Sequence, residues 1–547
     1  MNKSSAPVGI DFGTTNTLVY TYHPDDGPRL LVIDGGQPFG PIPTILTRSS
    51  SLAQLFAGLR AWAFRKRTPD ARTFRKFKLD LPATGASAKS RDIHQSYKNA
   101  RDFLKHVFNQ YEARSGFTGI SSLAFSVPES WLRGGDQIGI EAVHQLAKQL
   151  KLPAPIIVSE PVAAACFFAS RYRKIHGNGF DGFVMVYDHG GGTLDYSLVR
   201  IAGNRVTSID GQGIDKGHDT GKDGFGGEMF DVKVFSRVAS RHTEMRAYTP
   251  EQRDEWLHSF EEQKRQSCID FENKYDGVLK GNKSIALDEL AAVTVGNSIF
   301  PVLVGDLIDV FKSSFESKIE QSLRAFMAHC ARDQPTLTFN DASRFRVLLV
   351  GGFSTFYPVQ RLVRRVLLDQ YASPPEVFNS LFDRNECWSA TAQGACLVAA
   401  KQVEVADNCP YTFGIVSYSR DGTEKYNKLI ERGRARSDYA TPKYLDKEFH
   451  LVNIARSDGG TIRFYIERSG KAEEMHGKQS FSRILPGYEQ NIANKRWRFG
   501  CKCSDGLIFV YIKLAESRKY KYVRVGSFFD LIEGGLNEDD IIDGETD

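Results

Sequence analysis

Short apolar runs that end in an acidic residue and a glycine-rich turn recur along the chain. Residues 183–187 form one such run, which stops at Asp188; three glycines follow at positions 190–192, and a second β-like run begins after Thr193. Two short runs of β-type composition around a glycine-rich reversal predict a β-hairpin.

Residues 7–22 repeat this pattern near the start of the chain. A short β-like run ends in Asp11, residues 13–15 (Gly-Thr-Thr) turn the chain, and a second β-like run follows. Two hairpins of the same kind, far apart in the sequence, indicate two related halves that each offer a turn to one ligand. Either hairpin alone is weak support for this interpretation, whereas the pair is strong support.

The residue types in these turns favour a phosphate ligand. Glycine permits a close backbone approach, so the turn can direct its N–H groups at an anion. A carboxylate such as Asp11 or Asp188 would be repelled by phosphate, and a hard divalent cation between them, usually Mg²⁺ with several bound waters, removes the conflict. The pattern therefore predicts a metal–nucleotide site; the alternative is an ordinary tight hairpin with a surface aspartate.

Two other segments predict helices built from small side chains. A β-rich run within residues 156–174 ends at Ser159 and Glu160, and Pro161 occupies a position that the first turn of a helix tolerates. The alanine-rich residues that follow predict a helix suited to close packing against another helix, and residues 386–400 predict a second one. Glu160 is either a helix cap or a site carboxylate, and its position alone favours the cap.

A further strand precedes a pair of glycines. The apolar run 347–350 ends in Gly351 and Gly352, and a helix is expected after them. Its apolar positions at helical spacing are Val359, Leu362, Val363, Val366 and Leu367. Strand, glycine pair and helix in this order let a flat ligand lie against the backbone at the end of a sheet.

Other glycine-rich segments carry weaker signals. Residues 177–182 match G-x-G-x-x-G, but they precede a strand instead of following one, so they predict a loop. No G-x-x-x-x-G-K-[ST] pattern occurs in the chain, which excludes the P-loop NTPases. Residues 215–231 predict a loop that leads into a helix from about Glu228. Because helix N-termini bind anions, Gly226, Gly227 and Glu228 could border a phosphate.

Two charged stretches permit two interpretations each. Residues 60–78 are rich in basic side chains, which indicate either a patch for anions or nucleic acid or, as the favoured alternative, a solvated face. These side chains are Arg60, Arg65, Lys66, Arg67, Arg72, Arg75, Lys76 and Lys78. Residues 250–275 predict a charged helix whose Glu261, Lys264 and Arg265 are, taken alone, expected to lie on the surface.

Length and composition limit the class of protein. A chain of 547 residues should divide into more than one domain. Its 41% apolar and 25% charged residues are typical of a soluble globular protein, and a net charge of +5 is too small to imply nucleic acid by itself. No window approaches the roughly 20 apolar residues of a membrane helix, and residues 1–13 lack the apolar core of a signal peptide. The expected location is cytoplasmic.

The eight cysteines are too sparse for a disulfide framework. Cys501 and Cys503 form the only close pair, and alternation within a strand explains them better than zinc. They fall in the C-terminal part of the chain, where short β-like runs and turns replace amphipathic helices. We therefore expect a nucleotide-binding domain at residues 1–400, a β-rich domain at 401–532 and an acidic, disordered tail at 533–547.

The order of these elements resembles the nucleotide-binding domain of the Hsp70 family, within the actin/hexokinase/Hsp70 superfamily. GIDFGTTNT is similar to the family's first phosphate motif, SEPVAAA to its first connecting helix, and VYDHGGGTLDYS to its second phosphate motif. FGGEMFD resembles the loop that follows, and LLVGGFSTFYPVQ the adenosine motif. The resemblance implies an α/β fold, a two-lobed actin-like ATPase with ribonuclease H-like lobes, followed by a smaller β-rich domain that would correspond to a degenerate substrate-binding domain.

The resemblance also assigns site residues. Asp11 and Asp188 would hold Mg²⁺, largely through water, Thr193 would lie near the γ-phosphate of ATP, and Glu160 would order the attacking water. These four residues are the expected catalytic set, and the two aspartates are the expected metal ligands. The residues expected to bind ATP or ADP are Gly13, Thr14, Thr15, Asn16, Gly190, Gly191, Gly192, Gly226, Gly227, Glu228, Glu261, Lys264, Arg265, Gly351 and Gly352.

The chain departs from the family pattern at three places. Trp62 stands where the resemblance places the catalytic lysine, so the lysine expected opposite the phosphates is missing, with Arg60, Arg65 or Lys66 as alternatives. Thr355 stands where the adenosine motif has an arginine, and the leucine-rich linker is absent near residue 405. The expected function is a slow Mg²⁺-dependent ATPase that couples its nucleotide state to binding of a protein or peptide client by the β-rich domain. Alternatives are a nucleotide-sensing scaffold with little hydrolysis and an actin-like filament. A co-chaperone is a further expected partner, whereas membrane and nucleic acid are not.

Overall fold

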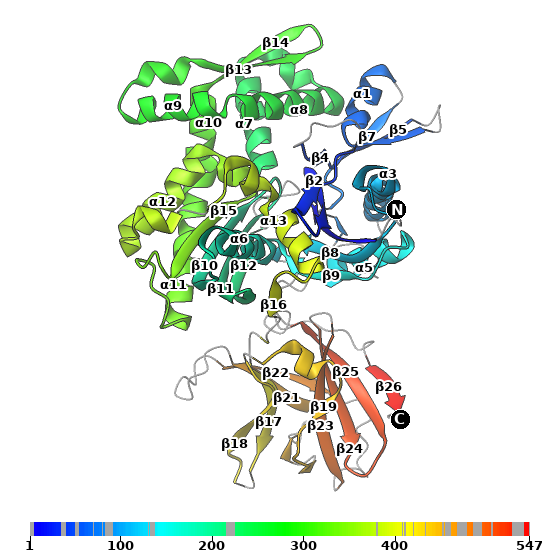
Figure 1. The fold of residues 1–547 in the computed structure, drawn as a ribbon. Coiled ribbons are helices and arrows are strands. Elements are labelled where there is room, and N and C mark those ends of the chain that lie inside the picture. The colour runs from blue at the N-terminus through cyan, green and yellow to red at the C-terminus, as the bar shows by residue number, and fades with distance from the viewer. Residues whose placement is uncertain are drawn as a thin grey trace. The chain divides into compact units, whose positions relative to one another are not determined.

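The computed structural model divides the chain into two units, drawn in Figure 1. Unit 1 comprises residues 1–129, 138–206 and 211–404, and unit 2 comprises residues 130–137, 207–210 and 405–547. The described residues are 5–33, 40–49, 54–68, 71–78, 80–81, 91–129, 131, 137–214, 225–378, 381–406, 409, 412–419, 421–432, 434–450, 453–454, 461–467, 478–484, 495–504, 507–527 and 541–545.

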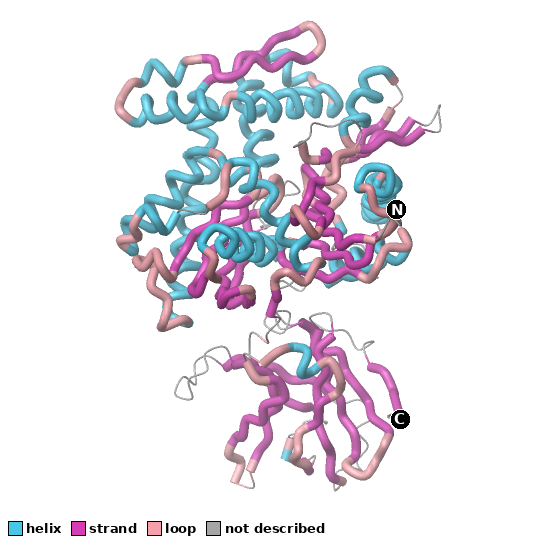
Figure 2. The backbone as a smooth tube through the Cα atoms, viewed as in Figure 1, coloured by secondary structure: helices cyan, strands magenta, loops and turns pink. Residues whose placement is uncertain are grey.

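Two mixed sheets form the centre of unit 1 (Figure 2). The first contains β1 (Ala6–Phe12), β2 (Asn16–His23), β3 (Gly27–Leu30), β4 (Ile42–Pro43), β8 (Ile120–Val127) and β9 (Pro155–Ser159). The second contains β10 (Phe180–His189), β11 (Leu194–Gly203), β12 (Arg205–Ile214), β15 (Phe345–Val350) and β16 (Glu404–Ala406). Their strand orders are β3-β2-β1-β8-β9, with β4 beside β2, and β15-β10-β11-β12-β16.

The two sheets repeat one local topology around a hairpin. β1 pairs antiparallel with β2 and parallel with β8, while β10 pairs antiparallel with β11 and parallel with β15. Both predicted hairpins are therefore confirmed. Their registers place Asp11 opposite Leu18 and Asp188 opposite Asp195. Each aspartate lies near the carboxyl end of its strand, which is the edge of a parallel sheet where ligands commonly bind.

The small-residue helices α6 (Glu160–His176) and α13 (Arg384–Ala399) pack against each other, as predicted. α6 also packs on β10 and β11, and α13 packs on β1, β2 and β8. A Cβ on Gly394 of α13 would lie 1.7 Å from the carbonyl oxygen of Ala163. The small side chains therefore allow the two helix backbones to meet, which links the two sheets.

The remaining helices of unit 1 are α1 (Leu59–Arg67), α2 (Arg91–Asn109), α3 (Tyr111–Ser115), α5 (Gln137–Gln149), α7 (Gly227–Arg241), α8 (Pro250–Gln266), α9 (Cys268–Leu279), α10 (Val304–Phe311), α11 (Ser317–Asp333) and α12 (Tyr357–Tyr371). Some of these helices flank the two sheets in Figure 1, and others, such as α8 and α9, stand at the top of the view. Two small sheets accompany them: β5 (Leu46–Ser49) between β6 (Gln54–Ala57) and β7 (Arg72–Phe74), and β13 (Glu289–Val295) with β14 (Ser298–Leu303). The expected helix after the glycine pair is α12, and its five predicted apolar positions are all buried.

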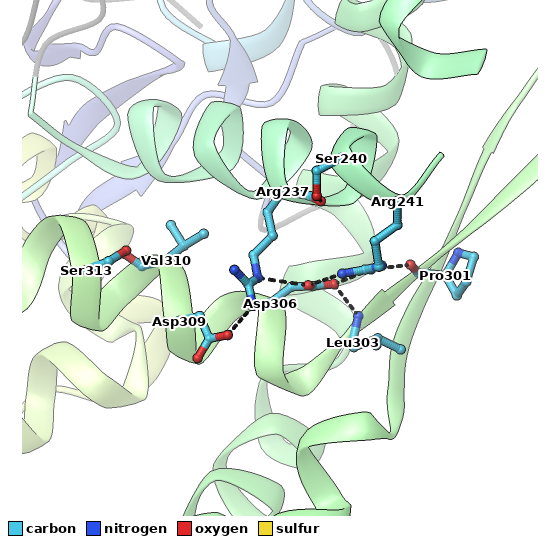
Figure 3. A network of polar contacts seen from close by, with 9 residues as sticks. All are labelled: Arg237, Ser240, Arg241, Pro301, Leu303, Asp306, Asp309, Val310 and Ser313. Carbon is cyan, nitrogen blue, oxygen red and sulfur yellow. Dashed lines mark hydrogen bonds and ion pairs between the residues drawn. The ribbon is translucent and has the colours of Figure 1, made fainter. Parts of the chain in front are cut away.

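A buried carboxylate fixes the C-terminal end of α7 (Figure 3). Asp306 of α10 is 2% exposed and accepts hydrogen bonds from Arg237 Nε at 3.2 Å and Arg241 Nη2 at 2.7 Å. The backbone N–H of Leu303 donates to the same carboxylate at 2.9 Å, and Arg237 also pairs with Asp309. These bonds tie α7 to α10 and β14.

The described part of unit 2 consists mainly of strands, as Figure 2 shows. One sheet has the order β18-β17-β21-β22, from β17 (Thr412–Tyr418), β18 (Glu424–Ile430), β21 (Thr461–Glu467) and β22 (Lys478–Ile484). The other has the order β19-β23-β24-β25-β26, with β20 (Phe449–His450) beside β23, from β19 (Lys443–Tyr444), β23 (Arg496–Ser504), β24 (Leu507–Leu514), β25 (Lys519–Ser527) and β26 (Ile541–Glu545). One 3₁₀ turn, η8, spans Arg436–Tyr439.

Side chains from both sheets form one apolar core, which includes Phe413, Phe464 and Val510. Cys501 and Cys503 lie on the buried face of β23 in this core, in agreement with strand alternation. Of the predicted acidic tail, residues 541–545 form β26, and residues 533–540 and 546–547 lie outside the described residues. No helix in the described ranges has the length and apolar character needed to cross a bilayer.

Candidate functional site

The turns of the two hairpins meet, although they lie far apart in the sequence. A Cβ on Gly191 would be 2.1 Å from Thr15 Oγ1, so the contact requires glycine at this position. Gly13 and Thr14 complete the first turn, and Asn16 begins β2. In the second hairpin, the N–H of Gly190 donates to the carbonyl oxygen of Thr193 at 3.1 Å, which closes the turn around Gly192. The structure thus brings the predicted phosphate-binding residues together.

Three carboxylates lie at the ends of neighbouring elements. Asp11 is on β1, where it accepts a hydrogen bond from Ser126 Oγ of β8 at 3.2 Å. Asp188 is on β10, and Glu160 is the first residue of α6; both are buried. The cap of α6 is Ser159, whose hydroxyl accepts from the N–H of Val162 at 3.4 Å. The interpretation of Glu160 as the cap is therefore wrong, and its side chain is available for other contacts.

Lys78 supplies the contact with Glu160. Its side chain is only 4% exposed, and Nζ lies 2.6 Å from Glu160 Oε1. The favoured interpretation of residues 60–78 as a solvated face is therefore wrong for this lysine, although Arg72 in the same stretch is exposed. The side chain of Trp62 lies outside the described residues, but the expectation that the carboxylates lack a lysine partner is wrong.

The neighbouring aromatic residue holds Lys78 in place. Phe77 is 1% exposed, and its ring centroid lies 6.2 Å from that of Phe12 and 5.8 Å from that of Phe103. Phe12 ends β1 and Phe103 belongs to α2. Burial of Phe77 between these elements fixes the backbone, so the adjacent ammonium group is directed to Glu160.

Burial and neighbouring charges shift the pKa values of Asp11, Asp188 and Lys78. Burial, aided by Glu160, raises the pKa of Asp11 to about 7. Burial likewise raises the pKa of Asp188 well above its ordinary range, and Glu160 and Asp195 add to the effect. Burial by itself would lower the pKa of Lys78, but the attraction of Glu160 and Asp11 outweighs it and raises the pKa. Four carboxylates thus interact with one ammonium group, and burial together with like charge disfavours the ionised forms of Asp11 and Asp188.

This donor set suits a hydrated divalent cation. A cation next to Asp11 and Asp188 would favour their ionised forms against the burial and the like charge that raise their pKa values. Within the described ranges, no group of three or more His, Cys, Asp or Glu side chains is arranged to hold a metal ion by itself. Mg²⁺ commonly binds through one or two carboxylates, several waters and substrate phosphates. The residues present therefore fit Mg²⁺ held largely through water.

The loop before α7 supports the second turn. The N–H groups of Gly227 and Glu228 donate to the carbonyl oxygens of Gly190 and Gly191 at 3.0 and 2.9 Å. A Cβ on Gly226 would lie 2.5 Å from the Gly191 carbonyl oxygen. The amides at the start of α7 thus fix the turn that follows Asp188.

Gly351 brings the predicted adenosine segment close to the carboxylate of Asp188. Its φ is +84°, a left-handed conformation that favours glycine, and a Cβ there would lie 2.5 Å from Asp188 Oδ1. Its N–H donates to the carbonyl oxygen of Cys387 at 3.2 Å. Next to it, Gly352 accepts a hydrogen bond from the hydroxyl of Thr355 at 2.7 Å. The side chain of Thr355 is therefore engaged with its own turn.

The expected adenine-side residues lie on α8. Lys264 pairs with the buried carboxylate of Asp231 on α7, and Nζ lies 5.7 Å from the ring centroid of Phe230. Glu261 is half-buried and Arg265 is exposed. Lys264 thus joins α8 to α7 instead of standing free on the surface, and all three residues lie on one helix that packs against α7.

Sequence reasoning missed Lys78, Asp195 and Ser126. A signal for Lys78 exists, because it lies between Phe77 and Leu79 and a lysine flanked by large apolar residues seldom belongs to a uniformly solvated face. Asp195 lies in the quoted second phosphate motif, and its partner Asp188 follows from the hairpin register. Ser126 carries no local signal, because only the parallel pairing of β1 with β8 places it beside Asp11.

Comparison with known proteins gives a consistent result. No family model matches the chain. The chaperone protein DnaK of Thermosipho melanesiensis is 22% identical over 437 residues, which cover 76% of this chain and 64% of the relative. The chaperone protein DnaK of Stenotrophomonas maltophilia is 23% identical over 574 aligned residues, which cover 98% of this chain and 80% of the relative. The movement protein Hsp70h of Lettuce infectious yellows virus is 25% identical over 226 residues, which cover 41% and 32%.

The chain spans less than two thirds of the length of the first of these relatives. The matches to DnaK extend over most of the chain, and the motifs that resemble the Hsp70 family converge on one site in unit 1. The similarity to DnaK chaperones over most of the chain supports a divergent Hsp70 family member.

Proposed function

We propose that the chain binds Mg²⁺ and ATP between its two hairpin turns and hydrolyses ATP slowly to ADP and phosphate. In this proposal the two mixed sheets belong to two lobes of an actin-like ATPase fold. Closure of the lobes on nucleotide would alter the hold of residues 401–532 on a protein or peptide client, with a co-chaperone as a further partner. The names of the DnaK relatives support the chaperone part of the proposal. A cytoplasmic location remains part of the prediction.

The residues of the site have separate tasks in this reaction. Asp11 and Asp188 would hold Mg²⁺, which would neutralise charge on the phosphates when bound. Thr14, Thr15, Gly191 and Gly192 would donate to phosphate oxygens, while Gly190 holds the turn closed through its bond to Thr193. Thr193 would lie near the γ-phosphate. Catalysis of this kind depends on positioning and on stabilisation of charge, because the phosphoryl group passes to water with little covalent help from the protein.

The observation that carries the proposal is the buried ion pair of Lys78 and Glu160 beside Asp11. The attraction of the carboxylates keeps Lys78 protonated, so its ammonium group would stabilise the charge on the transferred phosphoryl group. Glu160, held at 2.6 Å from this ammonium group, would orient the attacking water. The pair supports hydrolysis over the alternative of a nucleotide-sensing scaffold.

Two measurements on the full chain test the proposal. Isothermal titration with ATP, in the presence and absence of Mg²⁺, should give tight binding only with the metal. Release of phosphate under single-turnover conditions should then be slow and should require Mg²⁺. Tight ATP binding without phosphate release would select the scaffold, and absence of ATP binding would contradict both functions.

A further inference from the structure

The side-chain carboxylate of Glu228 binds hydrogen-bond donors and cations of the kind that bind phosphate. Its side chain is 10% exposed, and Oε1 accepts a hydrogen bond from Thr15 Oγ1 at 3.1 Å. Oε2 lies 3.1 Å from Lys76 Nζ, and Oε1 lies 3.7 Å from Arg75 Nη2. Thr15 belongs to the first hairpin turn, and the two basic residues belong to the segment that carries Lys78. The carboxylate of Glu228 thus contacts one hydroxyl group and two basic side chains.

The backbone of Glu228 belongs to the opposite side of the site. Its N–H donates to the carbonyl oxygen of Gly191 at 2.9 Å, so the residue is fixed to the second hairpin turn. Its side chain reaches the first turn. Lys76 has a φ of 58°, a left-handed conformation that costs a residue other than glycine about 1 kcal/mol or more and persists only where the surroundings impose it. The segment from Arg75 to Lys78 is therefore held in a defined shape that presents its cations to Glu228 and Glu160.

The chemistry of a carboxylate determines what Glu228 can do next to phosphate. An ionised carboxylate accepts hydrogen bonds and donates none, so its side chain cannot bind phosphate oxygens directly. It accepts from hydroxyl and ammonium donors as phosphate does, and it repels a neighbouring phosphate. The backbone N–H is committed to Gly191. These facts contradict a role for Glu228 as a simple phosphate ligand.

We propose that Glu228 competes with the polyphosphate for Thr15, Arg75 and Lys76, and that this competition sets how strongly affinity depends on the number of phosphates. The proposal rests on the nucleotide site proposed above. When nucleotide binds, Thr15, Arg75 and Lys76 release the carboxylate of Glu228 and bind phosphate oxygens instead. Glu228 is accordingly a positioning residue that holds the donors in place and opposes each added phosphate charge. The basic stretch thereby acquires a role that is neither nucleic-acid binding nor solvation.

Glu228→Gln tests the competition because it keeps the shape of the side chain and removes its charge. Affinities for ATP, ADP, AMP and adenosine are measured with Mg²⁺ by isothermal titration of the full chain. The variant should bind ATP about tenfold more tightly, the order expected for removal of one buried like charge, with a smaller gain for ADP and none for adenosine. Raising the salt concentration should shrink the gain.

Asp309→Asn is the matched control. Asp309 is a more exposed carboxylate that pairs with Arg237, which lies more than two helical turns after Glu228 in α7. Its loss also removes one negative charge next to α7, and all four affinities should stay as in the wild type. A gain in ATP affinity in this control would mean that net charge, and not competition at the donors, causes the effect.

Lys76→Asn gives a second test that does not depend on Glu228. Asparagine tolerates the left-handed backbone and removes the ammonium group. ATP affinity should fall about tenfold while adenosine affinity stays constant. Equal or weaker ATP binding by Glu228→Gln, or unchanged binding by Lys76→Asn, would overturn the competition. Failure of the wild type to bind ATP would instead overturn the proposed function, so the two failures are distinguishable.

Discussion

Replacing Lys78 by methionine removes one charge from the buried ion pair and keeps most of the side-chain volume. In the wild type, Nζ lies 2.6 Å from Glu160 Oε1, and both side chains are nearly inaccessible to solvent. After the replacement, Glu160 would lie near Asp11 and Asp188 without its cation. The variant therefore tests both the stability and the chemistry that the pair provides.

The expected magnitudes follow from this geometry. At 2.6 Å and an effective dielectric constant of about 20, the attraction is about 6 kcal/mol, and part of it offsets the cost of burying the ammonium group. Breaking such a pair on one side typically costs about 3–5 kcal/mol of unfolding free energy. Removing a group that stabilises charge on the reacting atoms typically costs about 10²–10³-fold in turnover.

The assay combines calorimetry with single-turnover release of phosphate. Lys78→Met should lower the melting temperature of the Mg²⁺-free protein and reduce phosphate release at least about a hundredfold at saturating ATP. Lys105→Met, which changes an exposed lysine of α2, should leave both quantities unchanged. If the Lys78→Met protein binds and hydrolyses ATP at the wild-type rate, Lys78 does not stabilise charge in the reaction.

Further predictions concern the carboxylates and the glycines. Asp188→Asn should raise the melting temperature of the Mg²⁺-free protein at pH 8, because burial and like charge disfavour the ionised carboxylate, and it should abolish the increase in melting temperature on addition of Mg²⁺ and ATP. Gly191→Ala should lower ATP affinity at least about tenfold, because the added methyl group would meet Thr15 and force the two turns apart. Gly190→Ala places a methyl group in open space and should cost less than about 1 kcal/mol of unfolding free energy, whereas Gly191→Ala should cost more, as measured by denaturant unfolding. Gly394→Ala should lower the melting temperature, because its Cβ would meet a carbonyl oxygen of α6; an unchanged melting temperature would contradict the close packing of α6 and α13.

Local patterns predicted the elements of the site well, because each carries its own signal. The glycine turns after Asp11 and Asp188 imply hairpins, and both hairpins form. The small residues after Pro161 imply close helix packing, which Gly394 makes possible at a carbonyl oxygen of α6. The five apolar positions of α12 imply a buried face, and all are buried. In each case the signal that predicts the element lies within a few residues in the sequence.

Interactions between distant segments could not be predicted in the same way. Composition places Lys78 in a solvated stretch, because it counts the charge but not the packing of Phe77 that buries the lysine. Position alone favours Glu160 as a helix cap, but Ser159 is the cap, and only the resemblance to a family assigns Glu160 to the site. The contact of Glu228 with Thr15 joins two residues that are 213 positions apart in the chain. Tertiary packing determines these features, and no local pattern encodes them.

The central claim is that both hairpin turns hold one Mg²⁺-bound polyphosphate and that Lys78 faces its terminal phosphate. A crystal structure of the full chain with Mg²⁺ and a non-hydrolysable ATP analogue tests it most directly. We expect the phosphates between residues 13–15 and 190–193, the metal beside Asp11 and Asp188, and Lys78 Nζ within hydrogen-bonding distance of a γ-phosphate oxygen. A nucleotide bound elsewhere, or a γ-phosphate out of reach of Lys78, would show that the two turns and Lys78 do not form the proposed site.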